Sequence, residues 1–161
     1  MSGETTLDLE AYLARIGYDG PLAPTLETLQ GLHYAHALSI PFENLDVLAK
    51  RPILLDLASL QKKLVREKRG GYCFEVNALF AAVLKELGFD VTTLIGRVRW
   101  MSPDEVDTAR PHMLMRVELP EGSSPADVGC GGRTMPGPIR SPPGVALRTP
   151  RSPPGVLTPG A

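Results

Sequence analysis

Cys73 is the residue of this sequence best placed to act as a nucleophile. It follows the segment Arg69-Gly70-Gly71-Tyr72, which predicts a turn because paired glycines permit backbone angles closed to other residues. Cys73 also begins a helical pattern, and a helix N-terminus favours a thiolate and can hold an oxyanion with its unpaired N–H groups. Position alone leaves a second interpretation open, a small buried apolar side chain, which is what most cysteines are.

A cysteine nucleophile needs a base, and the base needs a group that orients it. His112 begins a predicted strand, and Asp127 lies two residues into the next one, which we expect to start at residue 126. Residues near the facing ends of antiparallel strands come close together, so we expect His112 and Asp127 to touch. Taken singly, His112 could be a surface histidine at a strand end, and Asp127 could cap a turn. The order Cys, His, Asp is compatible with a papain-like site.

Four other polar residues have two interpretations each. His33 and His36 are three residues apart and could bind a metal, but no third ligand is near them in sequence, so we predict an ordinary helix face. Glu75 and Asn77 either support the segment that carries Cys73 or supply helix N-terminal charge and polar packing. Only two cysteines occur in a sequence that looks cytosolic, so we expect them to be reduced. Three histidines and two distant cysteines show no zinc-ligand spacing, so we expect no metal.

The first 89 residues predict a set of helices that must position Cys73. We expect helices to start at the capping residues Asp8, Thr25 and Asp56. Helix ends are expected at Gly17, Pro41 and Gly88. In the helix after Asp56, the periodicity places three leucines inward and three basic residues outward: Leu57, Leu60 and Leu64, against Lys62, Lys63 and Arg66. The segment 41–45 is expected to be a loop.

After residue 89 the apolar period changes to two, which is typical of strands. We expect strands at residues 90–100 and 112–119 and the start of a third strand at 126–129. A polar loop at 102–110 and a turn at 120–125 connect them. Val98 and Trp100 share one face of the first of these strands. Such a succession predicts an antiparallel sheet or barrel.

The overall composition is that of a soluble globular protein. The chain has 161 residues, of which 43% are hydrophobic and 22% charged, with a formal net charge of -1. A near-zero charge gives no strong electrostatic reason to bind nucleic acid or an anionic membrane. No apolar run could span a bilayer and the first residues lack signal-peptide order, so we expect a cytoplasmic location. Residues 133–161 are rich in Pro and Gly and predict a loose tail.

Several motifs resemble those of arylamine N-acetyltransferases. The run Arg69-Gly70-Gly71-Tyr72-Cys73-Phe74-Glu75-Val76-Asn77 resembles the family signature R-G-G-x-C-x-E-x-N, and Pro41-Phe42-Glu43-Asn44-Leu45 resembles its P-F-E-N-L loop. Further segments that resemble the family follow in the same order at 96–98, 111–113 and 126–129. The resemblance implies an α+β fold with a cysteine-protease-like Cys-His-Asp arrangement. The implied domains are a helical bundle over 1–89, the start of an antiparallel β-barrel over 90–132 and the tail.

By this resemblance the chain ends inside the barrel, before the α/β lid of the family. We therefore expect the 161-residue chain to bind acetyl-coenzyme A poorly. A further departure is Cys130, which stands where the family usually has phenylalanine, so an aromatic wall of the pocket is expected to be lost.

The resemblance also implies roles for individual residues. Cys73 would be the acetylated nucleophile, with His112 as its base and Asp127 as the orienting carboxylate. Residues that would contact substrates are Phe42 and Val98 for the arylamine, and Gly129 and Gly131 for the thioester. The implied reaction is a ping-pong acetyl transfer from acetyl-coenzyme A to an arylamine or hydrazine nitrogen, without a metal and with neither nucleic acid nor membrane as partner.

Two rival functions remain open from the sequence. The first is a cysteine peptidase or amidase that uses the same three residues to transfer the acyl group to water. The second is a truncated, non-catalytic remnant that keeps the fold and binds at most a partner or a small aromatic molecule.

Overall fold

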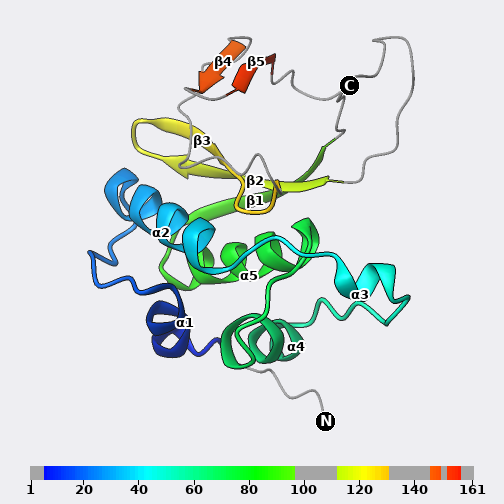
Figure 1. Ribbon diagram of the computed structural model, residues 1–161. Helices are drawn as coiled ribbons and strands as arrows, with labels where there is room; N and C mark the ends of the chain where they lie inside the picture. The colour runs from blue at the N-terminus through cyan, green and yellow to red at the C-terminus, as the bar shows by residue number, and fades with distance from the viewer. Residues whose placement is uncertain (1–5, 97–111, 131–145, 150–151, 157–161) are drawn as a thin grey trace.

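The computed structural model describes residues 6–96, 112–130, 146–149 and 152–156. These form an α+β protein with an antiparallel sheet, shown in Figure 1. Its elements in chain order are the helices α1 (Leu9–Ile16), α2 (Leu26–Ser39), α3 (Leu45–Leu48), α4 (Leu57–Leu60), the π-helix η1 (Gln61–Arg66) and α5 (Cys73–Glu86), then the strands β1 (Asp90–Gly96), β2 (His112–Leu119), β3 (Gly122–Ala126), β4 (Ala146–Thr149) and β5 (Ser152–Val156).

Local signals in the sequence explain where the helices begin and end. The carboxylates of Asp8 and Asp56 accept hydrogen bonds from the third residue beyond them, and the Thr25 hydroxyl does the same, so all three predicted N-caps are confirmed. Gly17 ends α1 in the left-handed conformation at φ 66°, and Gly88 follows α5 at φ 87°. These glycines are needed because other residues rarely adopt positive φ.

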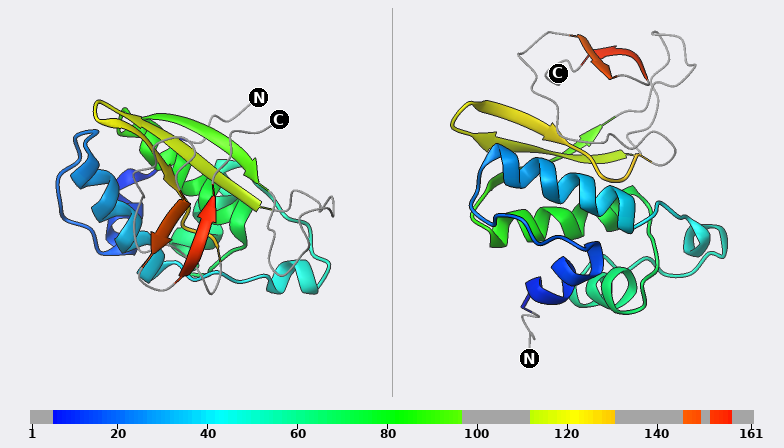
Figure 2. Two further views of the ribbon diagram at one scale, coloured as in Figure 1. Left: turned by 90° about the horizontal axis from the view of Figure 1, so that it is seen from above. Right: turned by 60° about the vertical axis from the view of Figure 1, so that its left-hand side comes forward.

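The described helices and the sheet lie in layers. The strands β1 to β3 cover one side of α2 and α5, and α1 and α4 lie on the other side of that helix pair (Figures 1 and 2). The core fills the space between the layers. Its fully buried side chains come from α1, α2, η1, α5, β2 and β3, and they include Tyr12, Leu29, Leu32, Leu64, Leu79, Phe80, Met115 and Ala126. Burial of these apolar side chains is the main stabilising term of such a fold.

The three-stranded sheet has the order β1-β2-β3, with both pairs antiparallel. In β1 and β2 the register runs from Asp90 opposite Glu118 to Gly96 opposite His112. Alternate residues of β2, namely Met113, Met115 and Val117, are buried, as expected for a strand with one face against helices. The described part of the predicted strand 90–100 ends at Gly96, and Val98 and Trp100 lie outside the described residues.

Two predictions about local structure were wrong. The predicted turn 120–125 is shorter, because β3 begins at Gly122 and pairs with β2 from Leu119 onward; Gly122, at φ 121°, permits the tight turn. The predicted strand 126–129 accordingly shrinks to the end of β3 at Ala126, and Asp127 follows the strand. Strand pairing outweighs the turn propensity of the serines and Pro125.

Lys63 was also predicted wrongly, because it does not face solvent. The exposed fraction of its side chain is 14%, whereas Lys62 is 71% exposed. Lys63 lies in the π-helix η1, and its side chain contacts the carboxylates of Asp46 and Glu75 instead of solvent. Leu60 and Leu64 are buried as predicted.

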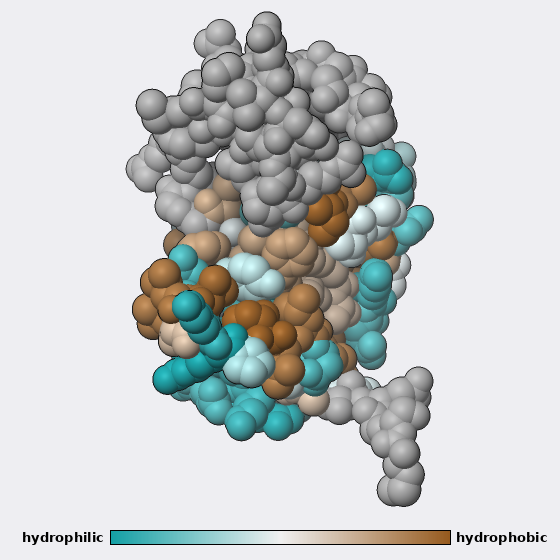
Figure 3. Space-filling view, turned by 90° about the vertical axis from the view of Figure 1, so that its right-hand side faces the viewer, coloured by the Kyte–Doolittle hydropathy of each residue, from teal (hydrophilic) through white to brown (hydrophobic). Residues whose placement is uncertain are grey.

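The segment 41–45 joins α2 to the short helix α3. Apolar side chains gather on the side of the molecule that carries α3 (Figure 3). The exposed ones there are Leu45, Val47, Leu48, Leu54 and Leu55. Within the described part of the chain, no helix is long and apolar enough to cross a membrane.

The other fold predictions were not tested. Within the expected tail, β4 and β5 pair antiparallel with each other as a separate two-stranded sheet. The looseness of the tail, the division into domains, the helical bundle and the barrel stay predictions.

Candidate active site

The first turn of α5 holds Cys73 in a buried position. Tyr72 is the N-cap residue of α5, and its backbone N–H donates to Glu75 Oε2 at 3.0 Å, so the carboxylate of Glu75 closes the first turn. Cys73 is the first residue of the helix, with 6% of its surface exposed. A thiolate here benefits from the positive end of the helix dipole.

Gly70 and Gly71 are required by crowding, and this corrects the predicted reason for them. Neither has a positive φ. A Cβ at Gly70 would lie 2.1 Å from the carbonyl oxygen of Pro41, because residues 41–43 run alongside the glycines. Backbone hydrogen bonds join the two segments, from Gly71 N to Pro41 O at 3.2 Å and from Glu43 N to Gly71 O at 3.0 Å. The paired glycines therefore let a second segment approach the start of α5.

His112 and Asp127 touch, as predicted from the strand order. His112 Nε2 and Asp127 Oδ2 are 2.6 Å apart, and both side chains are largely buried, with exposed fractions of 13% and 7%. The other side of the imidazole is hydrogen-bonded to the Cys73 thiol. Because Nε2 is taken up by Asp127, Nδ1 is the ring nitrogen available to Cys73. The three residues form the chain thiol, imidazole, carboxylate.

The pKa values of this chain favour an ion pair. Burial by itself would raise the pKa of the Cys73 thiol, but hydrogen bonds from His112 and from the Met113 and Phe74 backbone lower it below its usual value. The hydrogen bond to Asp127, followed by that to Cys73, raises the pKa of His112 to about 10. The lowered pKa of Cys73 and the raised pKa of His112 both favour a thiolate beside an imidazolium over the neutral pair.

The carboxylate of Asp127 is held in its charged form by several donors. Burial would raise the pKa of Asp127, yet hydrogen bonds from His112, Asn77 and the Gly129 backbone lower it overall. Asp127 Oδ1 accepts from Asn77 Nδ2 at 3.0 Å and from Gly129 N at 2.9 Å. These bonds fix the oxygen that His112 does not use, so the carboxylate has one orientation.

Asn77 ties together the three segments that meet at this site. Its Nδ2 donates to Met113 O in β2 at 2.7 Å as well as to Asp127, and its Oδ1 accepts from Val128 N at 3.0 Å. The side chain is fully buried in α5. Of the two interpretations of Asn77, support of the site fits these contacts. Gly129 lies close to the same helix, since a Cβ there would meet Val76, Cys73 and Asn77 within 3.0 Å.

The sequence did not indicate that His33 belongs to this network. His33 is fully buried in α2, and its Nε2 accepts a hydrogen bond from the Asp127 backbone N–H at 3.3 Å. Burial lowers the pKa of His33 to about 4, so the ring is neutral and can accept. His36 is also buried, with Nδ1 2.8 Å from the Tyr12 hydroxyl. The helix face on which both histidines lie is therefore a core face. The sequence separation of 94 between His33 and Asp127 leaves no local signal of their contact.

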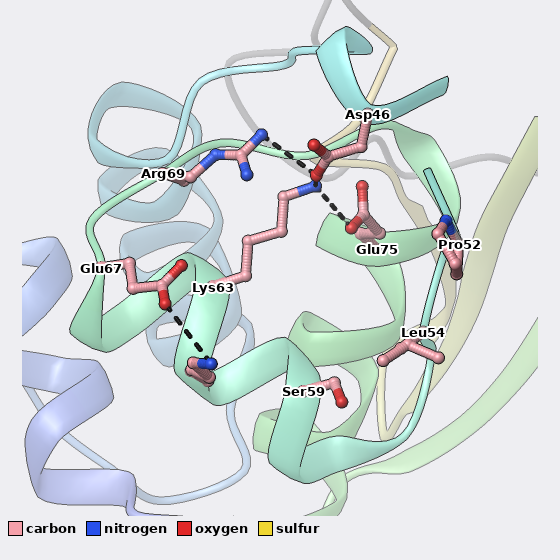
Figure 4. A pocket seen from close by; sticks show the side chains of 9 residues that line it. Asp46, Pro52, Leu54, Ser59, Lys63, Glu67, Arg69 and Glu75 are labelled. Carbon is pink, nitrogen blue, oxygen red and sulfur yellow. Dashed lines mark hydrogen bonds and ion pairs between the residues drawn. The ribbon is translucent and has the colours of Figure 1, made fainter. Parts of the chain in front are cut away.

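A cluster of ion pairs braces the segments around the start of α5. Lys63 Nζ lies 2.7 Å from both Asp46 Oδ2 and Glu75 Oε1, and Arg69 Nη2 lies 2.7 Å from Glu43 Oε1 and 3.0 Å from Asp46 Oδ2. Figure 4 shows Lys63 reaching between the carboxylates of Asp46 and Glu75 beside a small pocket. The cluster thus connects η1, the 41–46 segment and α5, and Glu75 joins it to the N-cap bond of Tyr72.

The structure places two of the four expected substrate contacts. Phe42 is 43% exposed beside the glycines that precede Cys73, where it pairs with Gly71 in an isolated β-bridge. Gly129 lies against Cys73, as described above. Val98 and Gly131 lie outside the described residues.

Comparison with known proteins gives one consistent family. The family model described as N-acetyltransferase matches residues 25–154. An arylamine N-acetyltransferase of Escherichia coli is 51% identical over 132 residues, which are 82% of this chain and 47% of the relative. The solved arylamine N-acetyltransferase of M. smegmatis matches with a TM-score of 0.85 at 45% identity, covering 97% of this chain and 58% of that one.

A third similar structure carries a ligand. The arylamine N-acetyltransferase of Mycobacterium marinum in complex with CoA matches with a TM-score of 0.81 at 44% identity, over 88% of this chain and 54% of that one. This chain thus spans about half the length of the relatives that it matches. The family model covers most of the chain, and the signature around Cys73 begins the helix that carries the thiol, so the chain belongs to the arylamine N-acetyltransferase family.

Proposed function

We propose that this chain transfers an acetyl group from acetyl-coenzyme A to an arylamine or hydrazine nitrogen through an acetyl-Cys73 intermediate. The proposal rests on one observation, the hydrogen-bonded chain from the Cys73 thiol through His112 to the Asp127 carboxylate. In this chain His112 Nε2 and Asp127 Oδ2 are 2.6 Å apart. A thiolate beside an imidazolium is the nucleophile that attack on a thioester requires. The CoA complex of the relative from M. marinum supports the choice of donor.

In the first half-reaction, the Cys73 thiolate attacks the carbonyl carbon of the thioester. A new sulfur–carbon bond forms, the bond to the coenzyme A sulfur breaks, and the leaving thiolate can take the proton of the His112 imidazolium. In the second half-reaction, the amine nitrogen attacks the acetyl carbon and loses a proton to His112. The acetamide leaves, and Cys73 is again a thiolate.

Asp127 supports this cycle without exchanging a proton. Its buried carboxylate orients the His112 ring and stabilises the imidazolium. Phe42 is proposed to contact the arylamine, because an exposed aromatic ring beside the nucleophile segment can stack on an aromatic substrate. Val98 and Gly131 keep their expected roles as predictions, and so does the cytoplasmic location.

The finer fold assignment belongs to the same proposal. We infer that the helices form the bundle of the family and that β1 to β3 begin its barrel. The consecutive antiparallel pairing of these strands supports this inference, as do the TM-scores of 0.85 and 0.81 with the solved relatives from M. smegmatis and M. marinum.

The experiment that tests the function uses an activated acyl donor, p-nitrophenyl acetate, because its reaction needs few contacts beyond the nucleophile. Release of p-nitrophenolate and formation of acetanilide are followed with and without aniline, for the chain and for Cys73→Ser. Acetyl transfer predicts Cys73-dependent release that aniline accelerates, with acetanilide as product. Acetate as the only product at an aniline-independent rate would identify a hydrolase, and identical traces for the chain and Cys73→Ser would identify a non-catalytic remnant.

A further inference from the structure

Three potential metal ligands from separate parts of the sequence meet at the proposed active site, and two of them are its histidine and carboxylate. One ligand atom each from His112, Asp127 and Cys130 lies within 4.8 Å of the other two. His112 begins β2, and Asp127 and Cys130 follow β3, so strand pairing brings the residues together. Their spacing in sequence has no zinc-like pattern, which is why the sequence predicted no metal.

We propose that His112, Asp127 and Cys130 form a binding site for a thiophilic divalent cation such as Zn²⁺. The donor set is a thiolate, an imidazole and a carboxylate, which suits Zn²⁺ or Cd²⁺ and not the oxygen-preferring Mg²⁺ or Ca²⁺. A thiolate and a carboxylate together balance the charge of a divalent ion, so the ion enters a largely buried site without leaving excess charge.

The geometry needs only local adjustment. Bonds of about 2.0–2.3 Å from Zn²⁺ to nitrogen, oxygen and sulfur place tetrahedral ligand atoms roughly 3–4 Å apart, compared with the 4.8 Å limit found here. Cys130 is exposed, so the ion can reach the three ligands from solvent. Asp127 is already fixed by Asn77 and the Gly129 backbone, which hold one of its oxygens and leave the other toward His112.

Binding would exchange protons for the ion. The 2.6 Å hydrogen bond between His112 Nε2 and Asp127 Oδ2 opens, and the proton of Nε2 and that of the Cys130 thiol pass to solvent. The imidazole nitrogen, the carboxylate and the thiolate then coordinate the cation through their lone pairs. Because the same imidazole and carboxylate serve Cys73, a filled site is incompatible with acyl transfer.

The test measures metal binding directly, with the purified chain and with single variants. Isothermal titration with Zn²⁺ should show one site, and Cys130→Ser should weaken it at least tenfold, since loss of a neighbour of a ligand alone costs about 10- to 100-fold. Cys73→Ser is the matched control and should retain binding. Replacement of Zn²⁺ by Co²⁺ should give a thiolate-to-cobalt absorption band that Cys130→Ser abolishes and Cys73→Ser keeps. Circular dichroism checks that each variant is folded.

Each of three outcomes would overturn the proposed site. These are absence of Zn²⁺ binding, equal binding by the chain and a folded Cys130→Ser variant, and binding that depends on Cys73 but not on Cys130. The last would place the ion on the nucleophile and His112. The proposed function is judged separately, because zinc binding is measured without any acyl donor.

Discussion

The chemistry of Cys73 is set by a single imidazole. His112 is bound on one side to a carboxylate and on the other to the thiol, so its positive charge is stabilised and the thiolate is stabilised in turn. The start of α5 adds its dipole to this effect. The alkylation rate of Cys73 should therefore depend on pH, and this pH dependence should change when His112 is replaced.

We expect iodoacetamide to alkylate Cys73 with a pH midpoint below the ordinary thiol value of 9.0, because the folded pKa is lowered and the thiolate already exists below that pH. His112→Gln removes the cation and should move the midpoint upward. The measurement is the alkylation rate against pH in a Cys130→Ser background, where Cys73 is the one remaining thiol. A midpoint at or above 9.0, or one unchanged in His112→Gln, would contradict this origin of reactivity.

Asn77 is expected to matter for stability as well as for the site. Asn77→Ala leaves the buried Val128 N–H and Met113 carbonyl without their partner, so the free energy of unfolding should fall by about 1–3 kcal/mol. Asn44→Ala is the matched control, since Asn44 is exposed and caps α3 without a side-chain hydrogen bond; its effect should stay within about 0.5 kcal/mol. Urea unfolding measures both, and equal effects would show that the Asn77 contacts carry no stability.

Among the elements, η1 supplies Lys63, which connects the 41–46 segment to the helix that carries the nucleophile. Lys63 of η1 contacts Asp46 and Glu75, and Glu75 in turn holds the first turn of α5. The hydrogen bond from Lys63, followed by that from Arg69, lowers the pKa of Asp46 to about 2. A carboxyl group whose pKa is lowered by folding stabilises the folded state at pH values above its unfolded pKa of 3.8. This stabilisation is lost as the pH falls through the folded pKa of about 2.

We therefore expect Lys63→Met to lower the urea midpoint clearly more than Lys62→Met. Lys63 Nζ lies 2.7 Å from the carboxylates of both Asp46 and Glu75, whereas Lys62 is exposed and 3.8 Å from its partner Glu67. The two variants remove the same group from neighbouring positions, so they differ only in what the side chain contacts. Indistinguishable urea midpoints near neutral pH would mean that the contacts of Lys63 with Asp46 and Glu75 do not stabilise the folded state.

The contrast between local and distant signals explains which parts of the structure could be predicted. The three helix caps and the glycine stops lie within a few residues of the features they determine, and they were predicted correctly. The contact of His112 with Asp127 followed from strand order. The inward turn of Lys63 and the bond from Asp127 to His33 depend on packing between distant segments, and no local pattern carries them.

At the scale of the whole molecule, the core of the described residues joins the sheet β1-β2-β3 to the helices behind it. Fully buried residues of α5 contribute to this core along the length of the helix, while the apolar side chains on the α3 side are exposed (Figure 3). Stability should follow this division, because only buried side chains lose contact with water on folding.

Leu79→Ala should lower the free energy of unfolding by about 2–5 kcal/mol, since Leu79 is fully buried and the smaller side chain leaves a cavity. Leu48→Ala makes the same chemical change at a leucine that is 70% exposed, and its effect should stay within about 0.5 kcal/mol. Thermal or urea unfolding compares them. A cost for Leu48→Ala as large as that for Leu79→Ala would mean that the α3 side is buried in solution.

The central claim is that Cys73, activated by His112 and Asp127, carries the acetyl group. The most direct measurement is mass spectrometry of the chain mixed with p-nitrophenyl acetate and quenched in acid, followed by peptide mapping. We predict one acetyl group on Cys73 that disappears when aniline is added, and much slower labelling in His112→Gln and Asp127→Asn. Acetylation confined to Cys130 or lysines, or a Cys73 label that forms as fast without His112, would contradict the account.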